Sequence, residues 1–231
     1  MRTAKTVLTV IQERGKQKKP IERVYKLLFN RELYLNAYAK LYPNNGAMTK
    51  GVTNETVDGM SIQKIDRMIE ILREEKYQWK PARREYIKKK NGKKRPLGIP
   101  VWGDKVLQEV MRQILEAYYE PQFSEHSHGF RPNRGCHTAL QEIQVWKGTR
   151  WFIEGDISQY FDTIDHKILL EILARNIHDG RFIRLVSNML EAGYLEEWKF
   201  NQTISGVPQG GVISPILALS LIHISEPTRR S

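Results

Sequence analysis

The stretch Arg150-Trp-Phe-Ile-Glu-Gly-Asp-Ile-Ser-Gln-Tyr-Phe-Asp-Thr-Ile-Asp165 says more about the fold than any other part of this sequence. It opens with aromatic and β-branched residues, which suit a pleated, half-buried strand. Gly155 and Asp156 then interrupt the apolar run, and a carboxylate at the end of such a strand needs a cationic partner. Two interpretations stay open for Asp156: a ligand of a divalent metal, or an ordinary strand end before a helix that starts near His166.

The composition indicates a basic protein with a polyanionic partner. The chain has 231 residues, of which 37 are Lys or Arg and 26 are Asp or Glu, so its formal net charge is +11 at pH 7. This balance favours nucleic acid as the partner, although a generally basic soluble protein has the same balance. No apolar run reaches membrane-spanning length, so no membrane partner is expected. The single cysteine, Cys136, excludes an internal disulfide and indicates a reduced, intracellular setting.

The distribution of apolar residues predicts an α+β fold. Residues 1–19 are polar and basic and are expected to be partly disordered. Apolar periodicity predicts helices over about 21–42, 104–119, 135–147, 165–176 and 180–191, and another helix that carries Ile62 to Leu72 with Ser61 as its N-cap. A strand pair is expected within 193–204, followed by a glycine-rich turn that leads into a last helix. Helices grouped around short antiparallel strands favour α+β over a doubly wound parallel sheet.

A basic hairpin is predicted over 83–100. Asn91-Gly92 between two strand-like runs is the strongest short-range hairpin signal. Eight of the thirteen residues from Arg83 to Arg95 are Lys or Arg. Such an arm can lie on nucleic-acid phosphates, or its lysines can protect an edge strand from aggregation. We favour phosphate contact, because eight cations exceed what edge protection requires.

Several motifs stand in an order that resembles one family. They are Arg95-Pro-Leu-Gly-Ile-Pro100, Phe123-Ser-Glu-His-Ser-His-Gly-Phe-Arg-Pro132, Glu154-Gly-Asp156 with Tyr160-Phe-Asp-Thr-Ile-Asp165, and Gly206-Val-Pro-Gln-Gly-Gly-Val-Ile-Ser-Pro215. Over about residues 20–218 the chain resembles the reverse transcriptases encoded by group II introns, which are also intron maturases. The resemblance implies the fingers and palm of a right-hand polymerase. It also implies RNA-templated DNA synthesis with two Mg²⁺ ions and a role in splicing and mobility of the host intron.

The resemblance also implies roles for individual residues. Asp156 would be the first catalytic metal ligand, joined by the backbone carbonyl of Ile157. Phe161 would be the steric gate that rejects a 2′-hydroxyl, and the alternative is a plain core residue. The residues expected at the nucleotide are Lys89 and Arg95 on the triphosphate, with Gln209 and Gly210 at the base. These roles agree with two-metal phosphoryl transfer, in which carboxylates hold Mg²⁺ and cations neutralise the triphosphate.

A second set of cations is expected to contact template or intron RNA. The set comprises Arg83, Arg84, Lys88, Lys90, Lys93, Lys94, Arg131 and Arg134. For Arg131 and Arg134 the alternative is pairing with Glu125 or Glu142. Asp162 and Asp165 are interpreted as helix caps rather than catalytic groups.

The domain organisation follows from the resemblance. We expect a basic N-terminal segment and helix over 1–41, a fingers-type region with the hairpin at 83–100 over 42–149, and a partial palm with interposed fingers helices over 150–218. The family's Tyr-x-Asp-Asp hairpin, with its two further metal ligands, and the thumb do not follow. We interpret residues 219–231 as read-through of a sequencing adapter, because Leu219-Ser-Leu-Ile-His-Ile-Ser-Glu-Pro-Thr-Arg229 resembles the translation of one. The encoding bases test this, and the 231-residue chain is expected to be inactive as a polymerase.

The expected partners are group II intron RNA, an RNA template with a DNA primer, and dNTPs. The expected location is the bacterial cytoplasm, within a ribonucleoprotein. One alternative is an intron-RNA-binding splicing factor without catalysis. Another is a retron, CRISPR-linked or diversity-generating reverse transcriptase, which shares the palm.

Overall fold

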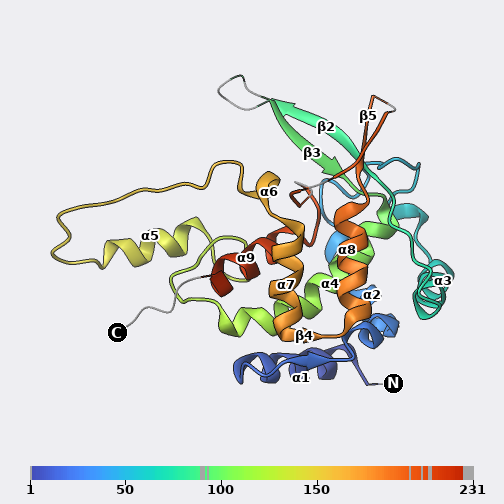
Figure 1. The fold of residues 1–231 in the computed structure, drawn as a ribbon, viewed down its shortest axis with the longest axis horizontal. Coiled ribbons are helices and arrows are strands. Elements are labelled where there is room, and N and C mark those ends of the chain that lie inside the picture. Colours follow the sequence, from blue (N-terminus) through green and yellow to red (C-terminus); the bar gives the residue numbers. More distant parts are fainter. Residues whose placement is uncertain are drawn as a thin grey trace.

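Helix α4, Trp102–Tyr119, is the central element of the fold, and most of its side chains are buried. The structure is a computed structural model, which describes residues 2–88, 92, 94–197, 199–203, 205–207 and 210–225. Helices surround α4, and a small sheet projects from one end of this helical body (Figure 1). One apolar cluster extends from Ala4 to Leu219. This core joins the described parts of all the expected domains, so it does not mark boundaries between them. The domain boundaries expected from the sequence therefore stay predictions.

The N-terminal segment is a helix, which corrects the expectation of disorder. Helix α1, Ala4–Lys16, begins after Thr3, whose side chain accepts a hydrogen bond from the Thr6 amide at 3.2 Å. Its buried residues are Ala4, Ile11 and Gly15, and the helix packs against α4. A Cβ on Gly15 would lie 2.1 Å from the carbonyl oxygen of Tyr118, so only glycine permits this contact. The segment is polar overall, but its few apolar positions share one face that α4 covers.

The helix expected over 21–42 is divided into shorter elements. Strand β1, Ile21–Glu22, is followed by the 3₁₀ helix η1, Val24–Phe29, and by α2, Arg31–Leu41. Asn30 ends η1 and caps α2, because its side chain accepts a hydrogen bond from the Glu32 amide at 3.0 Å. Asn30 lies within the run whose apolar spacing predicted one helix. Apolar spacing alone does not detect such a capping asparagine.

Long-range pairing attaches the N-terminal segment to the C-terminal half. Strand β1 pairs in parallel with β4, Ile177–His178. Strand β4 lies between helices α7, His166–Asn176, and α8, Gly180–Glu191. Asp179 caps α8 by accepting from the Arg181 amide at 3.2 Å, and its other carboxylate oxygen accepts from the buried Tyr25 amide at 2.9 Å.

The predicted hairpin is confirmed. Strands β2, Ala82–Lys88, and β3, Lys94–Ile99, pair antiparallel, with Arg83 opposite Ile99 and Lys88 opposite Lys94. Two short strands, β5 (Tyr194–Glu196) and β6 (Lys199–Asn201), extend the sheet in the order β3-β2-β5-β6. Strand β5 runs parallel to β2 through the pair Ala82 and Tyr194. The antiparallel β5–β6 pair confirms the strands expected within 193–204.

The remaining elements include one helix that stands apart from the core. They are η2 (Val57–Gly59), α3 (Ile62–Arg73), η3 (Glu120–Gln122), α5 (Cys136–Gln144), α6 (Tyr160–Thr163) and α9 (Ser214–Ser225). Ser61 caps α3 as predicted, accepting from the Lys64 amide at 3.2 Å. Helix α5 buries none of its residues, and Cys136 at its start is exposed. A long connection leaves α5 and returns to α6 (Figure 1). Among the described residues no helix is long and apolar enough to cross a membrane.

Helix α9 passes through the position where the sequence leaves the family pattern. Leu219 and Ser220, the first residues after that position, are buried in the core. The ring of His223 stacks on Phe123 with centroids 4.6 Å apart. An apolar run packs on an apolar surface whatever its genetic origin, so the adapter interpretation stays a prediction about the encoding bases. Residues 226–231 lie outside the described part of the chain.

Candidate functional site

The glycine-rich turn and helix α6 meet through backbone hydrogen bonds. The amide of Gly206 donates to the carbonyl oxygen of Ile164 at 2.8 Å, and the amide of Val207 donates to that of Phe161 at 2.8 Å. The His166 ring nitrogen Nε2 lies 2.6 Å from the Gly206 carbonyl oxygen. These contacts join two motifs that are about forty residues apart in sequence. The turn is therefore fixed next to the residue expected to be the steric gate.

Glycine is required at two points of this turn. Gly206 has a φ of +86°, and a Cβ there would lie 2.8 Å from the Phe161 carbonyl oxygen. Gly210 has a φ of +104°, and a Cβ there would lie 2.6 Å from the side chain of Leu97 on β3. Both values fall in the region that side chains rarely adopt. The contact between Gly210 and Leu97 brings the glycine-rich turn against the basic hairpin. The turn, the hairpin and the motif that contains α6 therefore meet at one place.

Phe161 lies at this junction in an aromatic group. Its ring meets Phe130 edge-on at 6.3 Å and Tyr160 at 5.8 Å. The Tyr160 hydroxyl donates to the Ala218 carbonyl oxygen at 2.9 Å, which ties α6 to α9. Phe161 is only partly buried. This placement is compatible with both interpretations of Phe161, and its role as steric gate stays a prediction.

Asp156 lies in an exposed, extended connection, and the strand expected at Trp151, Phe152 and Ile153 is absent. Trp151 is 87% exposed and Ile153 is 94% exposed, although both residue types favour buried strands. A strand needs a hydrogen-bonded neighbour, and no described residues pair with this segment. Local sequence preference therefore did not suffice to form the strand. Asp156 and Ile157 are both exposed, and their expected roles at a metal ion stay predictions.

The described residues do not assemble a metal site. No group of three or more His, Cys, Asp or Glu side chains is placed to hold an ion in the described part of the chain. Asp156 offers one carboxylate, and Mg²⁺ requires near-octahedral oxygen ligation. His126, His128 and His137 are likewise not part of any such group among the described residues. Instead His126 and His128 both contact the Glu142 carboxylate, His128 at 2.7 Å.

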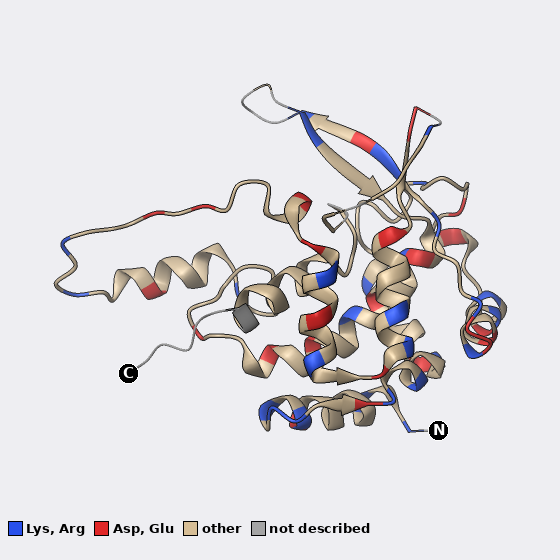
Figure 2. Cartoon of the chain, in the orientation of Figure 1, with Lys and Arg blue, Asp and Glu red and all other residues tan. Residues whose placement is uncertain are grey.

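The basic hairpin carries its cations on an exposed arm. Figure 2 shows Lys and Arg along β2 and at the outer end of the hairpin. Lys88, Lys94 and Arg95 are exposed there, while Arg83 and Arg84 at its base are partly buried. The expected contacts by Lys89, Lys90, Lys93 and Gln209 fall on residues outside the described part of the chain. These nucleotide and RNA contacts stay predictions.

Arg131 forms hydrogen bonds within the chain. It is 8% exposed, and its guanidinium donates to Glu120 and to the carbonyl oxygens of Ser124 and Ser127. These bonds engage the guanidinium within the chain, and the expected RNA contact of Arg131 stays a prediction. For Arg131 the alternative expected from the sequence was pairing with Glu125 or Glu142. In the structure its carboxylate partner is Glu120. Arg134 donates to the backbone carbonyl oxygen of Glu125.

Sequence reasoning missed the residues that position the turn. Gln108, in the middle of α4, is 5% exposed, and its side-chain oxygen accepts from the Val212 amide at 2.9 Å. Asp165 caps α7 as predicted, accepting from the Ile168 amide at 2.9 Å, whereas Asp162 lies within α6 and Gln159 takes the cap position. A polar residue within the apolar face of α4 was the available signal for Gln108.

The fold and the ordered motifs define a class, and comparison with known proteins agrees with it. Residues 87–228 match the family described as "Reverse transcriptase (RNA-dependent DNA polymerase)". The chain belongs to the reverse transcriptase family. The α+β architecture with a basic hairpin accordingly corresponds to the fingers and part of the palm of these polymerases.

Individual relatives are intron-encoded. The "Group II intron-encoded protein LtrA" of Lactococcus lactis subsp. cremoris is 49% identical over 203 residues, which cover 87% of this chain and 34% of the relative. The "Uncharacterized 91 kDa protein in cob intron" of Schizosaccharomyces pombe is 46% identical over 228 residues, covering 95% of this chain and 28% of the relative. The chain thus spans about a third of the length of these relatives.

A solved structure shares the fold at low identity. A chain of the "Partial Cas6-RT-Cas1--Cas2 complex" superposes with a TM-score of 0.57 and 19% identity, covering 86% of this chain and 34% of that chain. At this identity the likeness concerns the fold alone. The relatives of higher identity favour the group II intron type over the CRISPR-linked alternative.

Proposed function

We propose that this chain supplies the fingers and the first part of the palm of a group II intron-encoded reverse transcriptase. The complete enzyme polymerises dNTPs on an RNA template with Mg²⁺ and assists splicing and mobility of its intron. It acts in the cytoplasm, bound to intron RNA. The observation that supports this most is the meeting of Phe161, the glycine-rich turn and β3 at one junction, in a chain whose relatives are intron-encoded.

The chain's own residues have three tasks in this proposal. The hairpin cations neutralise phosphates of the triphosphate and of the nucleic acid. Phe161 limits the space beside the nucleotide sugar. Asp156 supplies one hard oxygen ligand to Mg²⁺, an ion that would activate the attacking hydroxyl and stabilise charge on the leaving group. Because Asp156 is one carboxylate in an exposed connection, the other ligands must come from outside the described residues.

A chimera tests the proposal. Residues 2–218 of this chain replace the matching segment of the L. lactis relative, which provides the rest of the polymerase. We expect the chimera to extend a DNA primer on an RNA template with dNTPs and Mg²⁺. Asp156→Asn should lower primer extension at least about 100-fold, because a metal ligand contributes several kcal/mol to transition-state stabilisation.

Asp165→Asn is the matched control. Asp165 caps α7, and asparagine caps a helix as well as aspartate does. The control should therefore keep its fold and its primer extension. A chimera that folds and binds RNA but does not extend the primer, or an Asp156→Asn chimera as active as its parent, would show that the proposal is wrong.

A further inference from the structure

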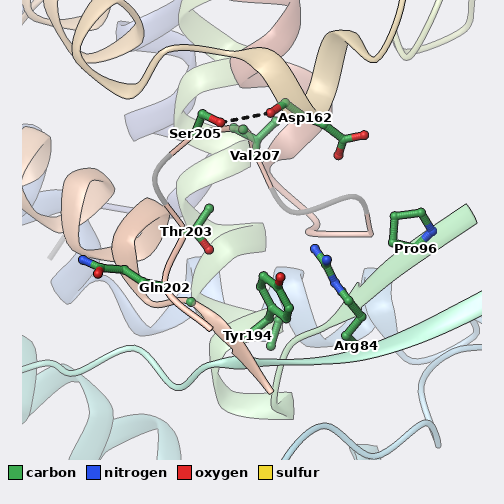
Figure 3. Close-up of a pocket in the computed structure, with 12 residues that line it drawn as sticks. Arg84, Pro96, Asp162, Tyr194, Gln202, Thr203, Ser205 and Val207 are labelled. Carbon is green, nitrogen blue, oxygen red and sulfur yellow. Dashed lines mark hydrogen bonds between the residues drawn. The ribbon is translucent and has the colours of Figure 1, made fainter. Parts of the chain in front are cut away.

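A cavity of about 520 Å³ lies between α3, the loop before it and the start of α4. The wall of this α3 cavity includes residues of 53–60, 64–71, 76–80 and 101–104. Among the described residues it shares none with the cavity between the hairpin and the glycine-rich turn, which Figure 3 shows. Helix α3 lies at the edge of the body opposite α5 (Figure 1). The volume of the α3 cavity is typical of sites for small molecules.

Apolar side chains form much of the wall of the α3 cavity. Met60 and Met68 line it and pack against the main core, and Ile71 adds a further aliphatic side chain. Trp102, buried at the start of α4, meets the Tyr38 ring edge-on at 6.3 Å. Methionine side chains adapt to the shape of a ligand and pack well against aromatic rings. This wall therefore suits a flat, apolar molecule.

Two buried polar atoms on this wall have no hydrogen-bond partner. They are Nε1 of Trp102 and the hydroxyl oxygen of Thr53, neither of which is bonded within the described part of the chain. An indole N–H can only donate. The other buried indole of this region, that of Trp79, donates to the Leu185 carbonyl oxygen at 3.0 Å. Because buried polar groups are nearly always bonded, two such groups on one wall indicate a ligand that carries an acceptor.

The charges around the α3 cavity favour an anion. Four Lys or Arg side chains and two acidic ones line it, namely Lys64, Arg67, Lys76 and Lys80 with Glu55 and Asp104. Two of the four cations, Lys64 and Lys76, already pair with carboxylates. Arg67, exposed on α3, forms no ion pair among the described residues, so its charge is available to a ligand.

Asp104 does not cancel this preference, because its carboxylate is bound within the wall. One oxygen accepts from the Tyr77 hydroxyl and the other from the Lys80 amide, and the charge of Lys80 acts on the same carboxylate. Burial raises the pKa of Asp104, which is typical of carboxyl groups in binding cavities.

We propose that the α3 cavity binds a small aromatic carboxylate. The ring system packs against the methionines and Trp102, and the carboxylate accepts hydrogen bonds from the Trp102 N–H and the Thr53 hydroxyl. Arg67 adds electrostatic attraction at the rim. The inference does not rest on the proposed function, because none of these residues is expected at the metal ion, the nucleotide or the RNA. A ligand here would join α3 and its preceding loop to the start of α4.

Nuclear magnetic resonance of the indole N–H groups tests the proposal on the 231-residue chain. The probe is 2-naphthoate, for which we expect a Kd of about 10–100 µM. The indole signal that Trp102→Phe removes should move downfield as the probe is added, because its N–H gains an acceptor. The signal that Trp79→Phe removes should stay in place, because that N–H is already bonded. The uncharged 2-naphthamide should bind several-fold more weakly.

Thr53→Val separates a ligand contact from a structural role. It removes a buried hydroxyl without a partner, so the free energy of unfolding should not fall, whereas affinity for 2-naphthoate should fall about tenfold. Arg67→Ala should abolish the preference for 2-naphthoate over 2-naphthamide. Arg73→Ala is the matched control, because Arg73 ends the same helix, lies over the Phe29 ring and is not part of the cavity wall.

Calorimetry measures these affinities and urea unfolding measures the stabilities, so Thr53→Val decides even if Trp102→Phe does not fold. The proposal is wrong if the Trp102 signal does not move at saturating probe, or if Thr53→Val binds 2-naphthoate as tightly as the parent. A loss of stability in Thr53→Val would show that the hydroxyl is bonded within the chain, which also contradicts the proposal. Equal effects of Arg67→Ala and Arg73→Ala would overturn the role of the anionic group.

Discussion

At the scale of single residues, burial determines what a charged side chain can do. Asp104, in the first turn of α4, is 3% exposed and accepts hydrogen bonds from the Tyr77 hydroxyl at 2.6 Å and the Lys80 amide at 3.0 Å. Burial raises the pKa of its carboxyl from 3.8 to about 6, although both hydrogen bonds oppose the shift. The sequence shows only an acidic residue near a helix start, which is an ordinary surface feature.

The raised pKa of Asp104 predicts a pH-dependent stability. Between pH 3.8 and about 6 the folded chain keeps a proton on Asp104 that the unfolded chain has lost, so this group makes stability fall as pH rises through that window. Asp104→Asn should remove this decline, which amounts to up to about 3 kcal/mol. Urea unfolding of both proteins at pH 4 and pH 7 measures it. Parallel changes with pH in the two proteins would contradict the prediction.

At the scale of elements, α5 depends on polar contacts instead of a buried face. It has no buried residue, and Leu140 and Ile143 on it are exposed. Glu142 of α5 contacts His126 and His128, and His128 also lies 2.8 Å from the Thr138 hydroxyl. The hydrogen bond from His128 is the main cause that lowers the pKa of Glu142. These side chains hold the helix against the loop that precedes it.

Glu142→Ala should therefore loosen α5 without unfolding the core. Amide hydrogen exchange of residues 136–144 should become several-fold faster, while α4 keeps its protection. The difference from the parent should vanish in acid, because a carboxylate with a lowered pKa loses its contribution as pH falls through that pKa. Glu125→Ala, whose side chain makes no hydrogen bond among the described residues, is the control. Equal exchange in the two variants would show that Glu142 does not hold the helix.

At the scale of the whole molecule, contacts between distant segments close the fold. Asp165 and Asp179 are both aspartate caps, on α7 and α8. Only Asp179 also binds the buried amide of Tyr25, 154 residues away, beside the parallel pair of β1 and β4. An unpaired buried amide costs about 1–3 kcal/mol beyond the lost cap.

Replacing the two caps by alanine separates local from long-range stabilisation. Asp165→Ala should lower the free energy of unfolding by about 1 kcal/mol, the usual value for a cap. Asp179→Ala should lower it by about 2–4 kcal/mol, because the Tyr25 amide also loses its partner. Chemical unfolding of both variants measures the difference. If the two variants lose equal stability, the contact with the N-terminal segment does not contribute.

The sequence alone determined those features that depend on near neighbours along the chain. The hairpin β2–β3, the caps Ser61 and Asp165, helices α7 and α8, and the family motifs follow from turn chemistry, capping and apolar periodicity. Local interactions of this kind act over a few residues, so a single sequence records them.

Only the tertiary structure decided which side chains meet and which are already bound. It folded residues 4–16 onto α4, paired Arg131 with Glu120, and placed Gly206 against Phe161. It also left Trp151 to Ile153 without the predicted strand, because a strand forms only where another backbone supplies its hydrogen bonds. Such outcomes depend on partners far along the chain, and the residue type by itself does not specify them.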